Sequence, residues 1–248
     1  MSESVVVIGN FDGVHPGHRE VLAVARQLEP DARLVVVTFW PHPLSVLRPG
    51  GGPVLLTRLE ERVDLLEAAG ADEVRVVRFT PEFAAWTPER FIAEIIEPLN
   101  PRRVVVGENF RFGHRAAGHV DTLRELGRGK FEVTALPLVG LGDQETCSTR
   151  IRDALAQGDV ENAARHLGRA LRFTGVVARG DRRGRELGFP TANLPVPAHL
   201  ACPADGVYAG WVVRLDGRDG RGVPVPEDAP AERWTAAISV GTNPTFDG

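Results

Sequence analysis

The chain of 248 residues is long enough for one large domain or two of ordinary size, and 43% of its residues are hydrophobic, a composition typical of a globular protein with a sizeable core. Its formal net charge of −4 excludes a global basic field and therefore extended binding to nucleic acid. The sequence shows no secretory signal and no apolar run long enough to cross a membrane, so we expect a cytoplasmic protein.

The first half of the sequence alternates strand and helix patterns. Continuous apolar, β-branched runs predict strands buried on both faces, and the amphipathic segments between them predict helices. Thr57 is expected to cap a helix over 58–69, with Glu60 in the capping-box position and Gly70 just past its end. This alternation predicts a doubly wound parallel sheet. The predicted strands are 5–8, 34–39, 74–77, 103–106 and 131–136, and the other predicted helices are 18–28 and 88–99.

The pattern changes after Gly142. Two short helices are predicted over 148–156 and 160–167, the second capped by Asp159. Beyond Gly168 the chain shows strands punctuated by Gly and Pro (173–178, 206–215 and 234–240), with a mobile hairpin loop over 216–231. We therefore expect two domains, 1–168 and 169–248. The second would be an antiparallel β module that is incomplete, because a small barrel needs more strands than remain.

A glycine-rich turn, Gly13-Val14-His15-Pro16-Gly17-His18, joins the first predicted strand to the helix that follows it. Ligands of α/β folds bind at the carboxyl ends of parallel strands, and a helix N-terminus there favours a phosphate. Gly13 and Gly17 let the backbone approach such a ligand, and His15 and His18 can both face it. The alternative reading of these residues is a simple glycine turn with two solvated histidines.

The whole run from Gly9 to His18 resembles the nucleotidyltransferases with an HxGH turn. More narrowly, it resembles the prokaryotic bifunctional riboflavin kinase/FMN adenylyltransferase (FAD synthetase) family. Three further segments match that family's pattern, each after a predicted strand: Pro41-His42-Pro43, 106–113 and 148–152. The resemblance implies a Rossmann-like α/β domain followed by a partial antiparallel β-barrel of riboflavin kinase type.

The residues of these segments also suggest ligand contacts by their own chemistry. Asn109 offers an amide for a base or isoalloxazine edge, and Arg152 offers a planar fork for phosphates. Ser148 and Thr149 open a helix, where they could either cap it or bind phosphate. The family more usually has an acidic residue where Trp40 stands, so no role is assigned there. By resemblance, His15 and His18 are catalytic, and the residues that line the ATP and FMN site are Phe11, Gly17, Asn109, Ser148, Thr149 and Arg152.

A second candidate site lies in the Gly- and Arg-rich segment 175–194. It reads either as a flexible charged turn or as a phosphate-cradling loop followed by neutral oxygen ligands for Mg²⁺. The segment looks like the nucleotide-and-metal loop of riboflavin kinases, and 206–210 and 241–246 match later parts of that module. The resemblance implies that Gly180, Gly184, Thr191 and Asn193 bind ATP, with Thr191 and Asn193 holding Mg²⁺.

The resemblance implies an enzyme that joins FMN and ATP into FAD and pyrophosphate, with Mg²⁺ neutralising the phosphates. The intact protein would also phosphorylate riboflavin. The family's general-base glutamate follows the Asn243-Pro244-Thr245-Phe246 turn, and the sequence ends before that position. We therefore expect FAD formation from FMN but little FMN formation from riboflavin.

Two alternatives remain open from the sequence. The first is another HxGH nucleotidyltransferase, acting on a pantetheine, nicotinate or glycerol phosphate; the kinase-like segment 175–194 argues against it. The second is a non-catalytic flavin-binding or regulatory protein; the retained pair His15 and His18 argues against that.

Overall fold

A computed structural model describes residues 2–48, 50–137, 140–141, 144–145, 147–178, 191–215 and 233–241 of the chain. The helices in the first half are α1 (Pro16–Leu28), α2 (Pro43–Leu47), α3 (Leu59–Ala68), α4 (Pro81–Ala84), α5 (Pro88–Phe91) and α6 (Val120–Leu126). They alternate with the strands β1 (Ser4–Ile8), β2 (Arg33–Trp40), β3 (Glu73–Arg78), β4 (Pro101–Gly107) and β5 (Glu132–Leu136). The five predicted strands are thus confirmed.

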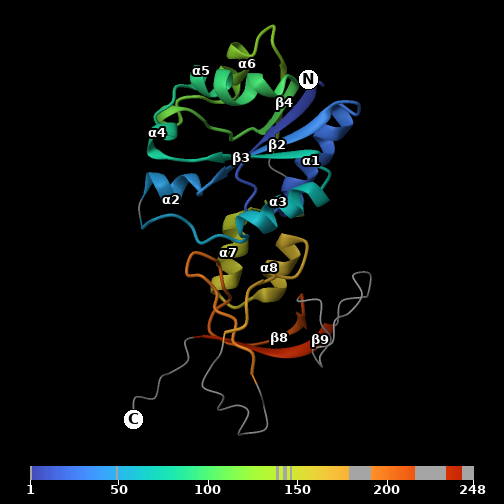
Figure 1. Ribbon diagram of the computed structural model, residues 1–248, viewed down its shortest axis with the longest axis vertical. Helices are drawn as coiled ribbons and strands as arrows, with labels where there is room; N and C mark the ends of the chain where they lie inside the picture. Colours follow the sequence, from blue (N-terminus) through green and yellow to red (C-terminus); the bar gives the residue numbers. More distant parts are fainter. Residues whose placement is uncertain are drawn as a thin grey trace.

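These strands form one parallel sheet in the order β3-β2-β1-β4-β5. Alternate strand residues face opposite sides. Val6, Val35 and Val104 pack with α5 and α6, whereas Val5 and Val36 pack with α1 and α3. Figure 1 shows the sheet between these two helical layers. The predicted doubly wound α/β fold is confirmed, with β1 at the centre, and the strand order reverses between β1 and β4.

The predicted helix over 88–99 is helical but irregular. After α5 it continues as a π-helical turn (Ile92–Ile96) and a 3₁₀ turn (Glu97–Leu99), and it ends at Asn100 in the left-handed conformation. Pro98 lacks the N–H that a regular α-helix would bond at this point, so the regular pattern cannot continue through it.

The predicted cap of α3 is wrong. The N-cap position belongs to Arg58, which makes no side-chain cap hydrogen bond. The Thr57 hydroxyl instead accepts the Gly13 N–H at 3.2 Å and lies 3.3 Å from an Asp12 carboxylate oxygen. A tertiary contact has therefore replaced the local capping bond that the sequence pattern suggested.

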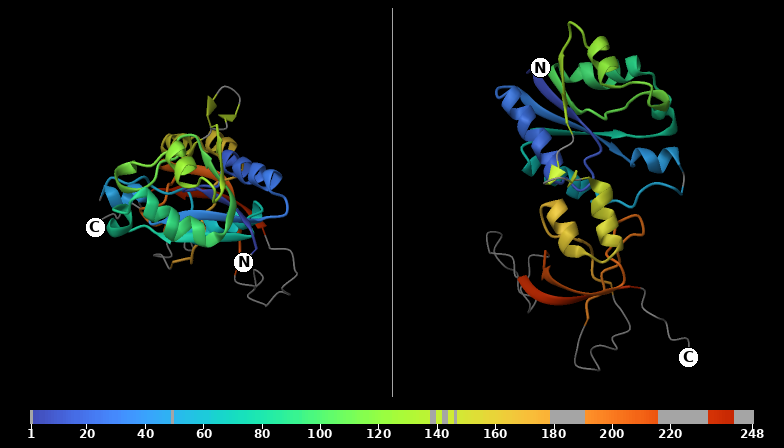
Figure 2. Two further views of the ribbon diagram at one scale, coloured as in Figure 1. Left: turned by 90° about the horizontal axis from the view of Figure 1, so that it is seen from above. Right: turned by 180° about the vertical axis from the view of Figure 1, so that it is seen from behind.

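The two short helices after the sheet are confirmed at their predicted bounds, as α7 (Ser148–Ala156) and α8 (Val160–Leu167). The Asp159 carboxylate accepts the Asn162 N–H and caps α8 as predicted. A short antiparallel pair, β6 (Gly140–Leu141) and β7 (Gln144–Glu145), precedes α7. The right-hand view of Figure 2 shows α7 and α8, drawn in yellow, below the parallel sheet.

The C-terminal part contains the antiparallel pair β8 (Gly206–Val213) and β9 (Arg233–Val240), which confirms two of the predicted strands. The strand predicted over 173–178 is wrong within the described residues. Only Ala178 bridges there, to Asn193, while Val176 and Val177 are exposed. A single bridge supplies no ladder of backbone hydrogen bonds. The predicted loop 216–231 lies outside the described residues.

The C-terminal part is joined to the first half through the segment that precedes α3. The Leu55 N–H donates to His199 at 2.7 Å, and its carbonyl accepts the Ala201 N–H at 2.8 Å. Next to it, Leu56 packs in one apolar cluster with Ile151, Leu155, Leu167 and Ala201. Residues from both predicted domains therefore share a core around α7 and α8.

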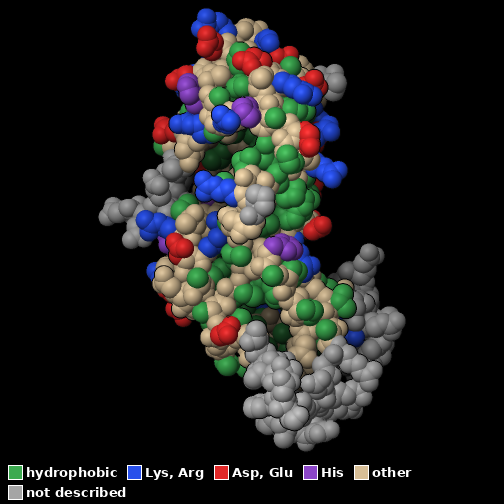
Figure 3. All heavy atoms as spheres, turned by 90° about the vertical axis from the view of Figure 1, so that its left-hand side faces the viewer, with side chains coloured by type: hydrophobic (Ala, Val, Ile, Leu, Met, Phe, Trp, Pro, Cys, Tyr) green, Lys and Arg blue, Asp and Glu red, His purple; other side chains and the backbone are tan. Residues whose placement is uncertain are grey.

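Charge on the molecular surface is mixed where it can be seen. On the face drawn in Figure 3, basic and acidic side chains are interspersed over the described residues of the upper part. None of the helices in the described part of the chain is long and apolar enough to cross a membrane.

Candidate active site

The HPGH turn lies where β1 ends and α1 begins, at the carboxyl edge of the sheet. His15 is the residue before α1, in an extended conformation, and Pro16 is the first residue of the helix. The helix thus begins two residues earlier than predicted and places His18 in its first turn. The two imidazole rings stack with centroids 3.6 Å apart and an interplanar angle of 21°. The Phe11 ring meets His18 edge-on at 5.2 Å.

The backbone between β1 and this histidine pair turns sharply. Phe11, Gly13 and Val14 all have positive φ, of 50°, 86° and 41°. At Gly13, a Cβ would lie 2.9 Å from Leu56 Cδ1, so both the conformation and the packing require glycine. Strained backbone of this kind is maintained only where the surroundings fix it, and it gathers at functional sites.

Burial keeps both imidazoles neutral near pH 7. The cost of placing a charge in this interior lowers the pKa of His15 to about 4 and the pKa of His18 well below its usual value. Among the described residues, neither His15 Nδ1 nor His18 Nδ1 has a hydrogen-bond partner. Buried ring nitrogens without partners are costly, and an anionic ligand at the helix N-terminus would provide acceptors for their N–H groups.

The buried carboxylate of Asp12 fixes the position of the HPGH turn. Asp12 is 2% exposed and accepts the backbone N–H groups of Leu56 and Thr57 at 3.0–3.2 Å. Two arginines also reach it: Arg62 Nη2 lies 3.3 Å from Oδ1, and Arg152 Nη2 lies 2.5 Å from Oδ2. The Asp12 side chain therefore connects the HPGH turn to α3 and α7.

The segment 148–152 meets the turn through two contacts with Asp12. One is the Arg152 ion pair, and the other is a 2.8 Å hydrogen bond from Ser148 Oγ to the Asp12 carbonyl. Arg152 Nε also donates to the Val54 carbonyl at 2.6 Å. Cys147, not Ser148 or Thr149, occupies the N-cap position of α7, so the capping alternative for these two residues is wrong.

Two further arginines lie around the turn. Arg169 Nη1 donates to the Gly13 carbonyl at 2.7 Å, and Arg19 follows His18 directly in α1. Together with Arg152, both act on His15, since their positive charges help to lower its pKa. This set of cations suits a polyphosphate.

The remaining predicted residues of this site occupy varied positions. Gly17 is buried in the first turn of α1, Thr149 is exposed at the start of α7, and Asn109 is exposed in the turn after β4. Because β4 neighbours β1 in the sheet, Asn109 follows the same carboxyl edge as the HPGH turn. His42, also after a strand end, is buried and accepts the Leu44 N–H at 3.2 Å through Nδ1.

The second predicted site is described only in part. Gly180 and Gly184 lie outside the described residues. Thr191 is exposed and Asn193 is half-buried, and the Asn193 carbonyl accepts the Ala178 N–H at 2.8 Å. These two residues are two positions apart in a segment without helix, so extended backbone would direct their side chains to the same face.

Sequence reasoning missed Asp12, Arg19, Arg62 and Arg169. Asp12 lies between two quoted residues of the motif, and Arg62 falls among the apolar positions of an amphipathic helix, where a charge signals a buried partner. Those signals were available. No sequence pattern marks Arg169 as a site residue, because its contact with Gly13 joins residues 156 positions apart in the sequence.

Family models and known relatives agree with one another for both parts of the chain. A family model described as FAD synthetase matches residues 1–150, and one described as riboflavin kinase matches residues 167–248. The chain is 35% identical to the bifunctional riboflavin kinase/FMN adenylyltransferase of Bacillus subtilis, over 99% of this chain and 74% of that protein. The protein of the same name from Escherichia coli K12 is 36% identical, over 98% of this chain and 74% of its own length.

A solved structure agrees in fold. A crystal structure described as a macrolide-efflux protein from Streptococcus pneumoniae is 34% identical, with a TM-score of 0.82, and covers all of this chain and 77% of that one. Its described role differs from the names of the two enzymes, whereas the family models and the enzymes agree with each other. The chain belongs to the family of bifunctional riboflavin kinases/FMN adenylyltransferases.

Proposed function

We propose that the chain makes FAD at the HPGH turn, by transferring the adenylyl group of ATP to FMN. An oxygen of the FMN phosphate attacks the α-phosphorus of ATP, the bond to the β-phosphate oxygen breaks, and pyrophosphate leaves. The observation that carries this proposal is the stacked, neutral pair His15 and His18 at the N-terminus of α1. Donors fixed in a site of this kind stabilise the charge that develops on the transferring phosphate.

The residue roles belong to the same proposal. His15 and His18 donate N–H groups to the transferring phosphate, and their low pKa values mean that both rings are neutral imidazoles before the polyanion binds. Arg152 contacts the nucleotide phosphates. We place Phe11, Gly17, Ser148 and Thr149 around the nucleotide, and Asn109 at the edge of the adenine or isoalloxazine ring.

Mg²⁺ at this site is expected to bind the nucleotide and not the protein. Its preferred protein ligands are carboxylates, and no group of three or more His, Cys, Asp or Glu side chains suited to a metal occurs among the described residues. Asp12 is the carboxylate nearest the turn, and its two oxygens already contact two arginines and two backbone N–H groups. It does not fit a role as metal ligand.

We assign residues 1–168 to the adenylyltransferase and 169–248 to the riboflavin kinase. The kinase would transfer the terminal phosphate of ATP to riboflavin, with Gly180 and Gly184 near the phosphates. Thr191 and Asn193 provide neutral oxygens that fit Mg²⁺ when it also binds phosphate. The family match over residues 167–248 supports this assignment. Since both reactions consume ATP, we place the protein in the cytoplasm.

The test is product analysis with purified protein, ATP and Mg²⁺, first with FMN and then with riboflavin. We expect FAD and pyrophosphate with FMN. His15→Asn and His18→Asn are each expected to lower FAD formation by about 10²–10³-fold, whereas His114→Asn, at an exposed position in a 3₁₀ turn, serves as the control. Turnover of a pantetheine, nicotinate or glycerol phosphate in place of FMN would refute the assignment. The riboflavin reaction tests the kinase separately.

A further inference from the structure

Arg62 is the largest of the fully buried side chains among the described residues, with 0% exposure. A buried guanidinium needs partners. Its Nη1 donates to the Asn10 carbonyl at 3.0 Å, and its Nη2 faces Asp12 at 3.3 Å. The Trp40 ring covers it with its centroid 5.5 Å away. Asn10 and Asp12 follow the carboxyl end of β1, and Trp40 is the last residue of β2. Arg62 therefore points from α3 to the carboxyl edge of the sheet, beneath the proposed adenylyl-transfer site.

Asp12 divides its two oxygens between two arginines. Oδ1 faces Arg62 and the Thr57 N–H, while Oδ2 faces Arg152. Arg152 is held by Nη2 and by Nε, which donates to the Val54 carbonyl. Within the described residues no hydrogen bond holds Nη1, which can therefore reach a phosphate oxygen. The side chain of Arg152 is 15% exposed, whereas Arg62 is fully enclosed. Only the first of the two can contact a ligand directly.

The charges in this group leave a surplus. Asp12 contributes −1 and the two arginines contribute +2, which gives a net charge of +1. Without Arg62, Asp12 and Arg152 would form a neutral pair, and this group would add nothing to the positive charge that Arg19 and Arg169 bring to the turn. We propose that Arg62 is a positioning residue for nucleotide binding: it neutralises Asp12, so that Asp12 can hold Arg152 in place while a net positive charge still faces the phosphates. This inference rests on the proposed adenylyl transfer.

The positive charge of Arg62 acts on two histidines, His18 and His42. After burial and the neighbouring His15, its charge is the next cause that lowers the pKa of His18, and it acts on His42 in the same direction. Two unit charges ~10 Å apart, at an effective dielectric constant of ~20, interact with a free energy that corresponds to about a tenfold change in affinity. Loss of Arg62 is therefore expected to weaken ATP binding by about that factor.

The test compares ligand affinities in variants that change the charge of this group. Calorimetry measures the Kd of ATP with Mg²⁺ and, separately, the Kd of FMN. Arg62→Met is expected to weaken ATP binding about tenfold and FMN binding less, because the Arg152 that it helps to position contacts the nucleotide phosphates. Arg62→Lys should stay within about threefold of the wild type. Arg26→Met is the matched control, because Arg26 forms an exposed ion pair with Asp72, at the far end of α1.

A double variant separates charge from structure. Asp12→Asn with Arg62→Met restores the net charge of +1 and keeps an oxygen acceptor for Arg152, so ATP affinity should return to within about threefold of the wild type. Equal weakening of ATP and FMN binding by Arg62→Met, or unchanged ATP binding, would overturn the proposal. If Arg62→Met does not fold, the double variant decides, and a tenfold loss of ATP affinity there would overturn it. Absence of FAD formation by the wild type would instead refute the proposed function.

Discussion

The stacked histidines make the stability of this protein depend on pH in a way that can be calculated for His15. Its pKa falls from an ordinary value of 6.5 to about 4 because the folded protein buries the ring. Below pH 6.5 the unfolded chain therefore binds a proton that the folded chain does not. The stability that this provides is retained above pH 6.5, and it is lost as the pH falls from 6.5 towards 4.

The size of the effect follows from the same two pKa values. Between pH 7.5 and pH 5.5, His15 should lower the free energy of unfolding by about 1 kcal/mol, and the full loss below pH 4 should approach about 3 kcal/mol. His18, whose pKa is lowered well below its usual value for the same main reason, changes stability in the same direction. His15→Asn removes the titrating group. The free energy of unfolding of this variant should therefore change less with pH than that of the wild type, by the amount calculated for His15.

Two measurements check this prediction. Urea unfolding of the wild type and of His15→Asn at pH 7.5 and 5.5 gives the difference in pH dependence, with His114→Asn as a control at an exposed position. NMR titration of the His15 ring should show no midpoint between pH 8 and 5.5. A midpoint near 6.5, or an equal pH dependence in wild type and His15→Asn, would refute the argument from burial.

Three further predictions concern stability and can be measured by urea unfolding at pH 7.5. Asp12→Asn should cost about 3–5 kcal/mol, because it leaves the enclosed Arg62 without its counter-charge; a loss below 1 kcal/mol would mean that Arg62 finds another partner. Leu56→Ala should cost about 2–5 kcal/mol, since Leu56 is 4% exposed in the cluster shared by both parts of the chain. Gly168→Ala should cost roughly 1–2 kcal/mol, because Gly168 has a φ of 73° and its Cβ would meet Arg19; an unchanged midpoint would contradict that reading.

Most of the helices and strands before Gly168 could be predicted from the sequence because their signals are local. The strands of a parallel sheet buried on both faces are continuous apolar runs, and α7 and α8 start and stop at the predicted residues. Local rules failed where a distant contact competed with them. Thr57 is a good cap by type, yet its hydroxyl bonds Gly13, 44 positions away in the sequence.

The candidate site was predictable as a motif but not as a network. The positions of His15 and His18 after β1 follow from the strand and the glycine turn. Their lowered pKa values do not, because these depend mainly on how deeply the folded chain buries the two rings. The pairing of Asp12 with Arg62 and Arg152 likewise requires three segments of the chain to meet.

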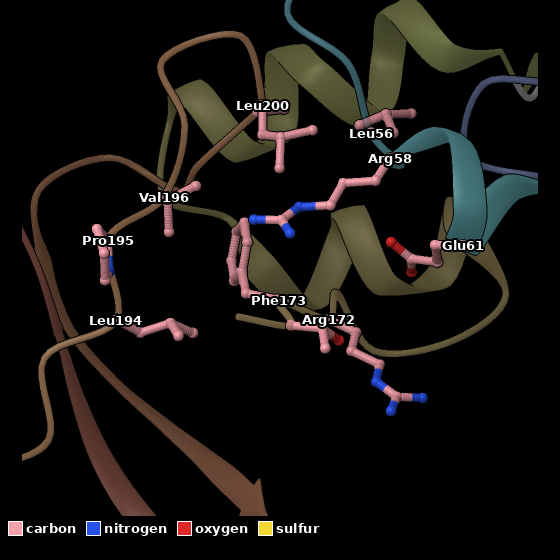
Figure 4. Close-up of a pocket in the computed structure, with 11 residues that line it drawn as sticks. Leu56, Arg58, Glu61, Arg172, Phe173, Leu194, Pro195, Val196 and Leu200 are labelled. Atoms are coloured by element: carbon pink, nitrogen blue, oxygen red, sulfur yellow. The ribbon is translucent and has the colours of Figure 1, made fainter. Parts of the chain in front are cut away.

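The segment before α3 connects the two proposed catalytic modules through adjacent residues. Leu55 pairs by its backbone with His199 and Ala201, and the next two N–H groups bind the Asp12 carboxylate. Beside this contact, Figure 4 shows Arg58 and Phe173, from different modules, lining one small pocket.

Backbone hydrogen bonds have little freedom to lengthen. A displacement of the C-terminal module at Ala201 would therefore reach Asp12 through Leu55, and with it the guanidinium of Arg152. The carboxylate that orients the proposed adenylyl-transfer site is thus fixed partly by the proposed kinase module. The geometry of the HPGH turn in this protein is a property of both modules together.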